Sequence, residues 1–281
     1  MCSNAEGEDY MVTKVLIDNI TKDDLLCEWG LSFYIEYDGH KILLDTGSGS
    51  NFAENAKALG VNLEEIEFGI LSHAHYDHAD GMPAFFGENK NAKFYLRKGA
   101  GENCYGKKNF FKYHYNGIQP GILENYKERI EYVEGDIKLM EGVYLIPHKT
   151  LRLERIAKKV DLYIRENGKM FPDDFAHEQS LVFDTPKGLV IFNSCSHGGV
   201  DNIITEIEAT FPEHKIHAFI GGFHLYKSTE ESVRALAARL KNTGVEKIIT
   251  GHCTGEKAFQ ILKEELGDGI SQMYSGMEII L

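Results

Sequence analysis

The sequence predicts an α/β fold in which two β-sheets are covered by helices. Strand-like runs joined by a hairpin turn dominate residues 12–49, whereas residues 179–281 alternate apolar strands with amphipathic helices. The chain has 281 residues, of which 43% are hydrophobic, so it can bury a sizeable core.

The N-terminal part predicts a β-hairpin, a helix and a further strand. Asp38 and Gly39 separate two β-rich runs, and an Asp-Gly pair in that position favours a tight turn. Residues 51–60 have the apolar spacing of a helix that stops at Gly60. The short apolar run at 67–72 predicts the next strand.

The C-terminal third predicts a partly parallel sheet, because its strands are separated by helices. The expected strands are 180–185, 189–194, 215–222, 247–251 and 277–281. The expected helices are 200–211, 231–244 and 255–267, with apolar stripes such as Ile203, Ile204 and Ile207.

The middle of the chain is less regular. Residues 93–178 mix Tyr, Phe, Lys and Gly, which favours loops and hairpins rather than a second core. We therefore expect a single domain, 1–281, with an insert at about 93–178 that shapes the substrate pocket.

Composition excludes several classes of protein. The net charge of −13 argues against nucleic acid as a partner, because a polyanion would be repelled. We also expect no membrane span and no signal peptide, hence a cytoplasmic protein. The five scattered cysteines do not suggest a disulfide framework. The sequence leaves open whether the protein forms a homodimer.

A dense cluster of metal-ligand side chains follows the strand at 67–72. His73 and His75 are separated by one residue and can point the same way, while Asp77 and His78 continue round the turn toward a second point. Imidazole nitrogens and carboxylate oxygens are the usual ligands of Zn²⁺. The loop therefore predicts two ligands for each of two metal ions.

Other strand ends must complete the two metal shells. The candidates follow Val/Ile/Phe runs and lie beside Gly, as expected at the carboxyl edge of a sheet. They are Cys195 and His197, His224, and His252 with Cys253. His177, which precedes a strand, is a further candidate, and Cys195 also suits a buried structural thiol. Asp45 ends an apolar strand and suits a carboxylate that orients a ligand histidine.

The motifs LLDTGSG, SHAHYDH and TGHCTG resemble those of the metallo-β-lactamase fold superfamily. CEWGLSFYIE, HEQSLVF, NSCSHGGVDNI and GGFHL are similar to the branch that includes archaeal dihydropteroate-synthase-like proteins of methanopterin biosynthesis. The resemblance covers nearly the whole chain. It implies a four-layer αββα sandwich of two mixed sheets flanked by helices, with a metal pair at the edge between the sheets.

The resemblance also implies how the ligands divide. By the motif, the first metal takes His73 and His75, and the second takes Asp77, His78 and His252. Many members of the superfamily carry a bridging aspartate after the strand that here ends near Cys195, but this chain has no Asp there until Asp201. His197, Cys195 or His224 is expected to fill that place.

These ligands predict an enzyme, a metal-dependent hydrolase. One or two divalent ions, Zn²⁺ in the first place with Fe or Mn as alternatives, would lower the pKa of a bound water so that hydroxide can attack the substrate. Asp77 is the expected catalytic residue, because it can orient that hydroxide or relay its proton. The branch leaves open a transferase that joins a dihydropterin pyrophosphate to an aromatic amine. A non-catalytic metal-binding protein is the third alternative.

The expected substrate is a small, anionic, ring-containing ester or phosphoester. Basic and aromatic side chains of the insert give this otherwise acidic protein local positive charge and surfaces on which a ring can stack. The candidate substrate-binding residues are Lys107, Lys108, Phe111, Tyr113 and His148.

Overall fold

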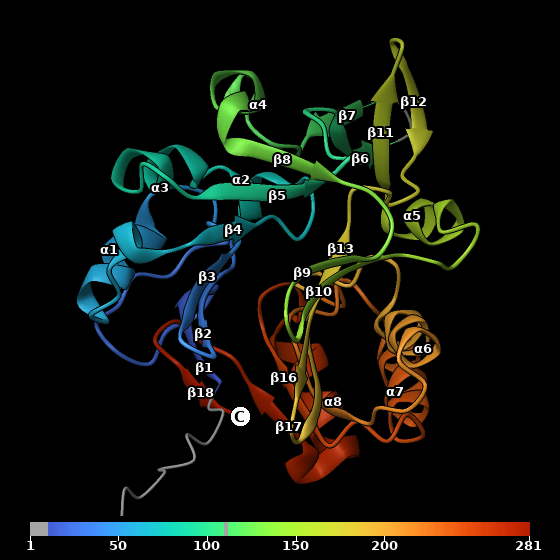
Figure 1. Ribbon diagram of the computed structural model, residues 1–281. Coiled ribbons are helices and arrows are strands. Elements are labelled where there is room, and N and C mark those ends of the chain that lie inside the picture. Colours follow the sequence, from blue (N-terminus) through green and yellow to red (C-terminus); the bar gives the residue numbers. More distant parts are fainter. Residues whose placement is uncertain (1–10, 110–111) are drawn as a thin grey trace, which may run out of the picture.

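The computed structural model describes residues 11–109 and 112–281. Two seven-stranded sheets lie face to face, and helices cover the outer face of each sheet (Figure 1). This arrangement confirms the predicted αββα sandwich. Within the described ranges, no helix combines the length and the apolar character needed to span a membrane.

The first sheet combines a hairpin-rich start with parallel strands. In spatial order its strands are β18 (Glu278–Ile280), β1 (Val12–Ile17), β2 (Ser32–Tyr37), β3 (His40–Leu44), β4 (Phe68–Ile70), β5 (Lys93–Arg97) and β8 (Ile130–Val133). The β2–β3 turn has positive φ at Asp38 (49°) and Gly39 (76°), as a two-residue hairpin turn requires. Strands β3, β4, β5 and β8 run parallel, so the loops after β3 and β4 leave the same edge.

The second sheet brings the C-terminal strands together. In spatial order its strands are β17 (Ile270–Gln272), β16 (Lys247–Thr250), β15 (Ile216–Ile220), β14 (Gly188–Phe192), β13 (Gln179–Thr185), β10 (Val143–Pro147) and β9 (Ile137–Met140). Strands β14, β15, β16 and β17 are parallel neighbours. The sequence analysis missed β17, which is only three residues long.

Helices pack on the outer faces, and a third apolar cluster fills the space between the sheets. The helices are α1 (Asn51–Ala58), α2 (Tyr76–Ala79), α3 (Met82–Glu88), α4 (Ile122–Asn125), α5 (Glu154–Val160), α6 (Val200–Thr210), α7 (Glu230–Leu240) and α8 (Glu256–Leu266). Between the sheets, Phe192 lies edge-on to Phe33 and Phe183, with ring centroids 5.4 and 5.8 Å apart. These buried rings join the two halves of the sandwich.

The region 93–178 is divided among three sheets. Its strands β5 and β8 belong to the first sheet, and β9 and β10 to the second. Its other strands form a small separate sheet in the order β12 (Lys169–Pro172), β11 (Leu162–Glu166), β6 (Cys104–Asn109) and β7 (Lys112–Tyr115). The part that lies outside the sandwich is thus shorter than the predicted insert, and the single domain stays a prediction.

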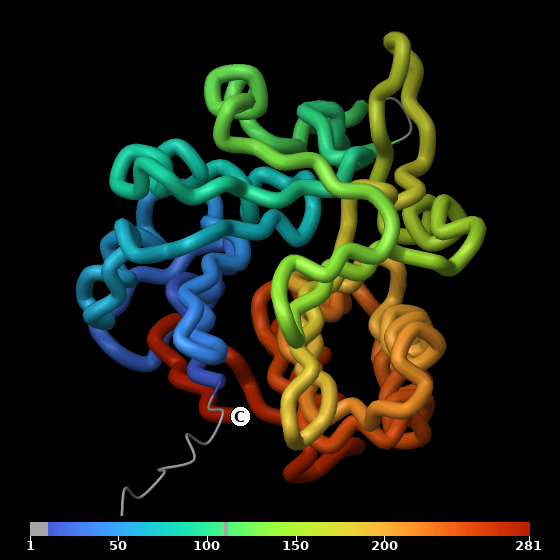
Figure 2. The backbone as a smooth tube through the Cα atoms, viewed as in Figure 1, coloured from blue at the N-terminus to red at the C-terminus, as the bar shows by residue number. Residues whose placement is uncertain are grey.

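Both ends of the described chain meet in the first sheet. Strand β18 pairs antiparallel with β1, so the red C-terminal strand lies beside the blue N-terminal one (Figure 2). The first and last strands of the described chain therefore belong to the same sheet, although the chain contributes strands to both sheets in between.

Candidate metal centre

The predicted ligands converge from the carboxyl ends of strands in both sheets. His73 and His75 follow β4, and Asp77 and His78 lie on the short helix α2, which begins directly after His75. The second sheet contributes the loops after its neighbouring parallel strands β14, β15 and β16, which carry His197, His224 and His252. Parallel neighbours end at one edge, which is why residues far apart in sequence meet here.

The first set of potential ligands is His73, His75 and His197. Their nitrogens lie within 4.8 Å of one another, and all three side chains are buried. The Nε2 atoms of His73 and His75 are buried with no hydrogen-bond partner among the described residues. Buried polar atoms are nearly always paired in proteins, so these two nitrogens fit a cation as their partner.

The second set is Asp77, His78 and His252. Asp77 Oδ2 lies 3.5 Å from His252 Nε2 and 3.8 Å from His78 Nε2. The two Nε2 atoms are 3.2 Å apart. All three side chains are buried, so this set could hold a second ion.

Hydrogen bonds to Nδ1 orient the imidazoles. Asp45 Oδ2 accepts from His78 Nδ1 at 2.8 Å and from the Ser72 hydroxyl at 2.7 Å. The Ser72 oxygen in turn lies 2.8 Å from His73 Nδ1. Asp45 therefore lies where a carboxylate that positions ligand histidines was expected.

Two further Nδ1 partners come from residues that the sequence analysis did not single out. Asn19 Oδ1 accepts from His252 Nδ1 at 2.9 Å, and Glu178 Oε1 accepts from His197 Nδ1 at 3.2 Å. Glu178 lies within the quoted stretch HEQSLVF, but its role depends on a contact with a loop 19 residues away. No local pattern marks such a contact.

These contacts decide which ring nitrogen carries the proton. A carboxylate or amide oxygen only accepts, so the Nδ1 atoms of His78, His197 and His252 are protonated and their Nε2 atoms are the ones that can face a metal. The Nε2 atoms of His78 and His252 lie 3.2 Å apart, a spacing that requires a proton or a metal ion between them. The residues present therefore fit a divalent metal.

Electrostatics favour neutral rings at His73 and His75 and a charged ring at His252, where burial opposes the charge but Cys253 and Asp77 raise the pKa to about 9. Burial, together with the neighbouring imidazoles, lowers the pKa of His73 and of His75 well below the ordinary value of 6.5. Burial opposes the charge on Asp77, but His78 and His252 outweigh it and hold the pKa of that carboxyl below its usual range. Neutral imidazoles and an ionised carboxylate are the forms that bind metal.

The backbone around the centre is strained. Positive φ angles occur at Asp45 (60°), Ser196 (51°), His224 (49°) and His252 (48°), a conformation that costs free energy in residues other than Gly. Gly81 is needed for space, since a Cβ there would lie 2.1 Å from the Thr46 carbonyl oxygen. Such strain is typical of sites where side chains must point in defined directions.

Two sulfurs border the centre. Cys195 Sγ lies 3.3 Å from His78 Nε2 and 3.4 Å from Cys253 Sγ. Cys195 can group with His73 and His78, or with His224 and Cys253. The sequence analysis placed Cys253 in a candidate motif without assigning it a role.

His177 is engaged elsewhere. Its Nδ1 accepts from the Ala74 backbone N–H at 3.1 Å, and its Nε2 lies 3.0 Å from Asp173 Oδ2. With both nitrogens occupied, His177 holds the loop between His73 and His75 rather than presenting a free lone pair to a metal, although it can also be grouped with His75, Cys104 and Asp173. His177 as a metal ligand therefore stays a prediction, and its described contacts favour a role in positioning the loop.

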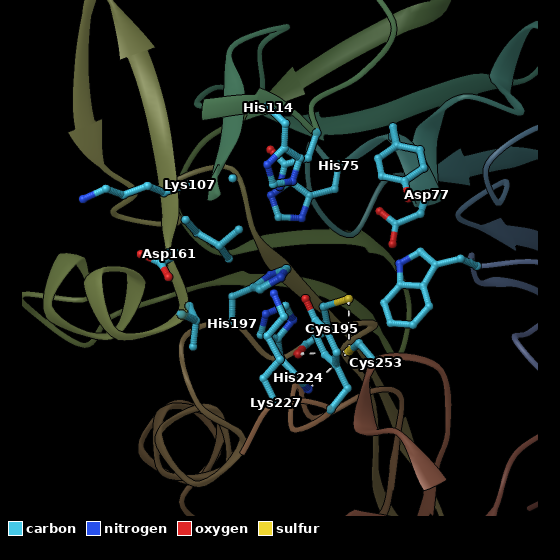
Figure 3. Close-up of a pocket in the computed structure, with 17 residues that line it drawn as sticks. His75, Asp77, Lys107, His114, Asp161, Cys195, His197, His224, Lys227 and Cys253 are labelled. Carbon is cyan, nitrogen blue, oxygen red and sulfur yellow. Dashed lines mark hydrogen bonds between the residues drawn. The ribbon is translucent and has the colours of Figure 1, made fainter. Parts of the chain in front are cut away.

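A cavity of about 350 Å³ opens onto both sets (Figure 3). His75, His197 and Asp77 line it from the centre. Its other walls carry Lys107, His114 and Lys227, together with the aromatic residues Trp29, Tyr76 and Tyr226. The cavity therefore combines potential metal ligands, positive charge and exposed rings.

Only some of the predicted substrate-binding residues line the cavity. Lys107 lines the cavity, whereas Lys108 and Tyr113 are not among its lining residues, and Phe111 lies outside the described residues. Tyr113 packs instead on Tyr163, with ring centroids 5.2 Å apart. The Tyr113 ring therefore packs on the small sheet, to which its strand β7 belongs.

His148 was also expected in the pocket, and the structure corrects this. The ring is buried between two carboxylates, with Nε2 against Glu178 and Nδ1 3.1 Å from Glu206 Oε2. Burial opposes its charge, but Glu178 and Glu206 raise the pKa of His148 to about 9. His148 therefore supports Glu178 from behind instead of facing a substrate.

Comparisons with known proteins agree with this geometry. The family model described as "Metallo-beta-lactamase superfamily" matches residues 30–152. A protein of Methanocaldococcus jannaschii named 7,8-dihydropterin-6-methyl-4-(beta-D-ribofuranosyl)-aminobenzene-5'-phosphate synthase is 33% identical over an alignment of 273 positions, which covers 88% of this chain and 88% of that protein.

Solved structures give the same fold. One described as a metal-dependent hydrolase of the beta-lactamase superfamily has a TM-score of 0.82 and 30% identity, and covers 96% of this chain and 98% of its own. The metallo-beta-lactamase fold protein YhfI of Bacillus subtilis has a TM-score of 0.58 at 11% identity, with 98% and 100% covered. The second likeness bears on the fold alone.

Proposed function

Because this chain belongs to the metallo-β-lactamase superfamily, in the branch that includes archaeal dihydropteroate-synthase-like proteins of methanopterin biosynthesis, we propose that it is a metal-dependent hydrolase. One observation carries the proposal: members of both ligand sets line a single cavity of about 350 Å³. The proposed substrate is a small, anionic, ring-containing ester or phosphoester.

The residues that would hold the metals are the two sets already described. His73, His75 and His197 would hold one ion, and Asp77, His78 and His252 the other. Imidazole and carboxylate ligands suit Zn²⁺, with Fe or Mn as alternatives. A divalent ion bound there supplies Lewis acidity and lowers the pKa of a water molecule toward neutrality.

The protein's own residues then have separate tasks. Asp77 lines the cavity, and its lowered pKa keeps it ionised, so it can orient a nucleophile or accept a proton. Lys107 and Lys227 offer positive charge to a phosphate or carboxylate, and His114, whose pKa is lowered by burial and by Lys108 and Lys227, offers a hydrogen bond from a neutral ring.

Aromatic side chains would bind the ring of the substrate. Trp29 is 41% exposed and Tyr226 is 42% exposed, and their rings meet edge-on with centroids 5.3 Å apart. Exposed rings at the rim of a cavity can pack against a planar ligand at little cost in conformational entropy. These features favour a ring-containing anion over a simple aliphatic ester.

The test is turnover by the zinc-loaded protein on an aryl phosphodiester, an aryl lactone and a thioester. We expect one of these to be hydrolysed, with activity lost in His75→Ala and kept in the control His40→Ala. His40 is a half-exposed histidine that pairs with Glu67 and lies at the start of β3, at the opposite end of the strand from Asp45. Equal activity in His75→Ala and His40→Ala would show that the ligand sets take no part in the reaction.

A transferase is the second candidate, and a specific observation favours it. The relative from Methanocaldococcus jannaschii is named a synthase. In addition, a second cavity of about 370 Å³ shares Val160, His197 and His224 with the first, which provides room for a second reactant. Turnover only when an aromatic amine acceptor is added to a pterin-type donor, with no hydrolysis of the panel, would replace the hydrolase proposal.

A further inference from the structure

A second kind of ligand set lies beside the histidine-rich centre. Cys195, His224 and Cys253 follow the neighbouring parallel strands β14, β15 and β16, so the sheet brings them to one place. Their potential ligand atoms lie within 4.8 Å of one another. Figure 3 shows the two thiols and His224 gathered at one wall of the cavity.

The spacing of the two sulfurs suits a bound ion better than a disulfide. Cys195 Sγ and Cys253 Sγ are 3.4 Å apart. Two thiolates on a tetrahedral ion, with bonds of about 2.3 Å, lie about 3.8 Å from each other. A disulfide requires about 2.05 Å. A small outward movement therefore reaches the ion geometry, whereas a disulfide needs a much larger approach.

The third member has a nitrogen to offer. His224 Nδ1 is buried and has no hydrogen-bond partner in residues 11–109 and 112–281. The backbone N–H of His224 donates to Cys253 Sγ at 3.2 Å, which holds the histidine beside the sulfur. A Cβ at Gly222 would lie 2.5 Å from the same sulfur, so a glycine is needed to let Cys253 approach.

We propose that Cys195, Cys253 and His224 form a third cation site, which takes a thiophilic ion. Thiolate ligands select ions such as Zn²⁺, Cu⁺ or Cd²⁺ over Mg²⁺ and Ca²⁺. Both sulfurs belong to the lining of the first cavity, which gives an ion a route from solvent. The site is chemically distinct from the two imidazole and carboxylate sets.

Cys253 distinguishes this proposal from a simpler one, in which Cys195 alone acts as a ligand in the histidine-rich centre. Cys195 can also group with His73 and His78, so its loss could affect either site. Cys253 groups only with Cys195 and His224 among the described ligand sets. The decisive variant is therefore Cys253→Ser, with the exposed Cys27→Ser as a matched control.

The experiment is a cadmium titration of the reduced, metal-free protein, followed by the ultraviolet sulfur-to-cadmium charge-transfer band. We expect a saturable band that falls by about half in Cys253→Ser and in Cys195→Ser, since one of two thiolates is gone in each. Cys27→Ser should keep the full band. His224→Ala should weaken cadmium binding by at least about tenfold, because even outer partners of a metal site contribute that much.

Two results would overturn the site. A full band in Cys253→Ser means that Cys195 acts alone in the histidine centre, and the absence of any band in the reduced protein means that neither sulfur binds. Circular dichroism of each variant identifies a folding defect, and the double serine variant must then lose the whole band of the folded fraction. His75→Ala tests the proposed hydrolase separately, since that variant should keep the band.

Discussion

Replacing Glu178 by Gln should weaken both the fold and the metal centre. Glu178 is wholly buried and accepts from the His197 backbone N–H at 3.1 Å, from His197 Nδ1 at 3.2 Å and from the Gly198 N–H at 3.2 Å. The fourth donor is His148 Nε2. The substitution keeps the volume but turns one acceptor into an NH₂ group that faces other N–H groups.

The expected magnitude follows from these contacts. Burial opposes the charge of Glu178, yet His148 and His197 hold the pKa of that carboxyl well below its ordinary value, so it is an ion in the folded protein. Removing one partner of a buried ion pair costs about 3 to 5 kcal/mol of unfolding free energy. Loss of the partner of a ligand histidine lowers metal affinity about 10- to 100-fold.

The assay has a matched control in the same cluster. Glu206 also contacts His148 and accepts from the N–H groups of Lys149 and Thr150, but its described contacts do not include His197. Urea unfolding of metal-free protein gives stability, and competition with a zinc chelator gives affinity. Glu178→Gln should change both, whereas Glu206→Gln should lower stability and leave zinc affinity as it is.

An equal loss of zinc affinity in the two variants would refute this reasoning. It would mean that the cluster acts on the centre through general loosening of the fold. Unchanged affinity in Glu178→Gln, with the expected loss of stability, would equally show that orientation of His197 does not depend on this carboxylate.

Three further predictions follow from buried charge, packing and the cavity. Because the pKa of His148 is raised from 6.5 to about 9, its stabilisation is complete below pH 6.5 and is lost as pH rises through 9; unfolding free energy measured between those values should fall, and His148→Gln should make that slope smaller, with the remainder coming from His177 and His252, whose pKa values are also raised. Phe192→Ala should cost about 3 to 5 kcal/mol in urea unfolding, because the ring fills the space between the sheets; a smaller loss means that the sandwich closes around the gap. Lys227→Ala should raise KM about tenfold with kcat kept, as for a charge that binds the substrate uniformly, and the exposed Lys187→Ala should leave KM unchanged.

Much of the fold was accessible from the sequence because its signals are local. The Asp38-Gly39 turn, the helix at 51–58 and the alternation of strands and helices after residue 179 depend on neighbours within a few residues. The strand β17 and the division of residues 93–178 among three sheets were not accessible. Strand β17 has one apolar residue, Ile270, and so lacks the apolar run that marked β4 and β18, and sheet membership depends on long-range pairing.

The sequence by itself determined which residues are the candidate ligands: four ligand-type side chains between His73 and His78, and histidines at the ends of later strands. Only the tertiary structure decided which of these residues lie together in each ligand set. The parallel order β14, β15, β16 brings His197 to the first set and Cys253 beside Cys195. His148, which follows β10, is held between Glu178 and Glu206 instead of facing the cavity. The spacing of ligands within one loop follows from consecutive residues. Contacts between residues of two loops depend on how the strands before those loops pair in the sheets.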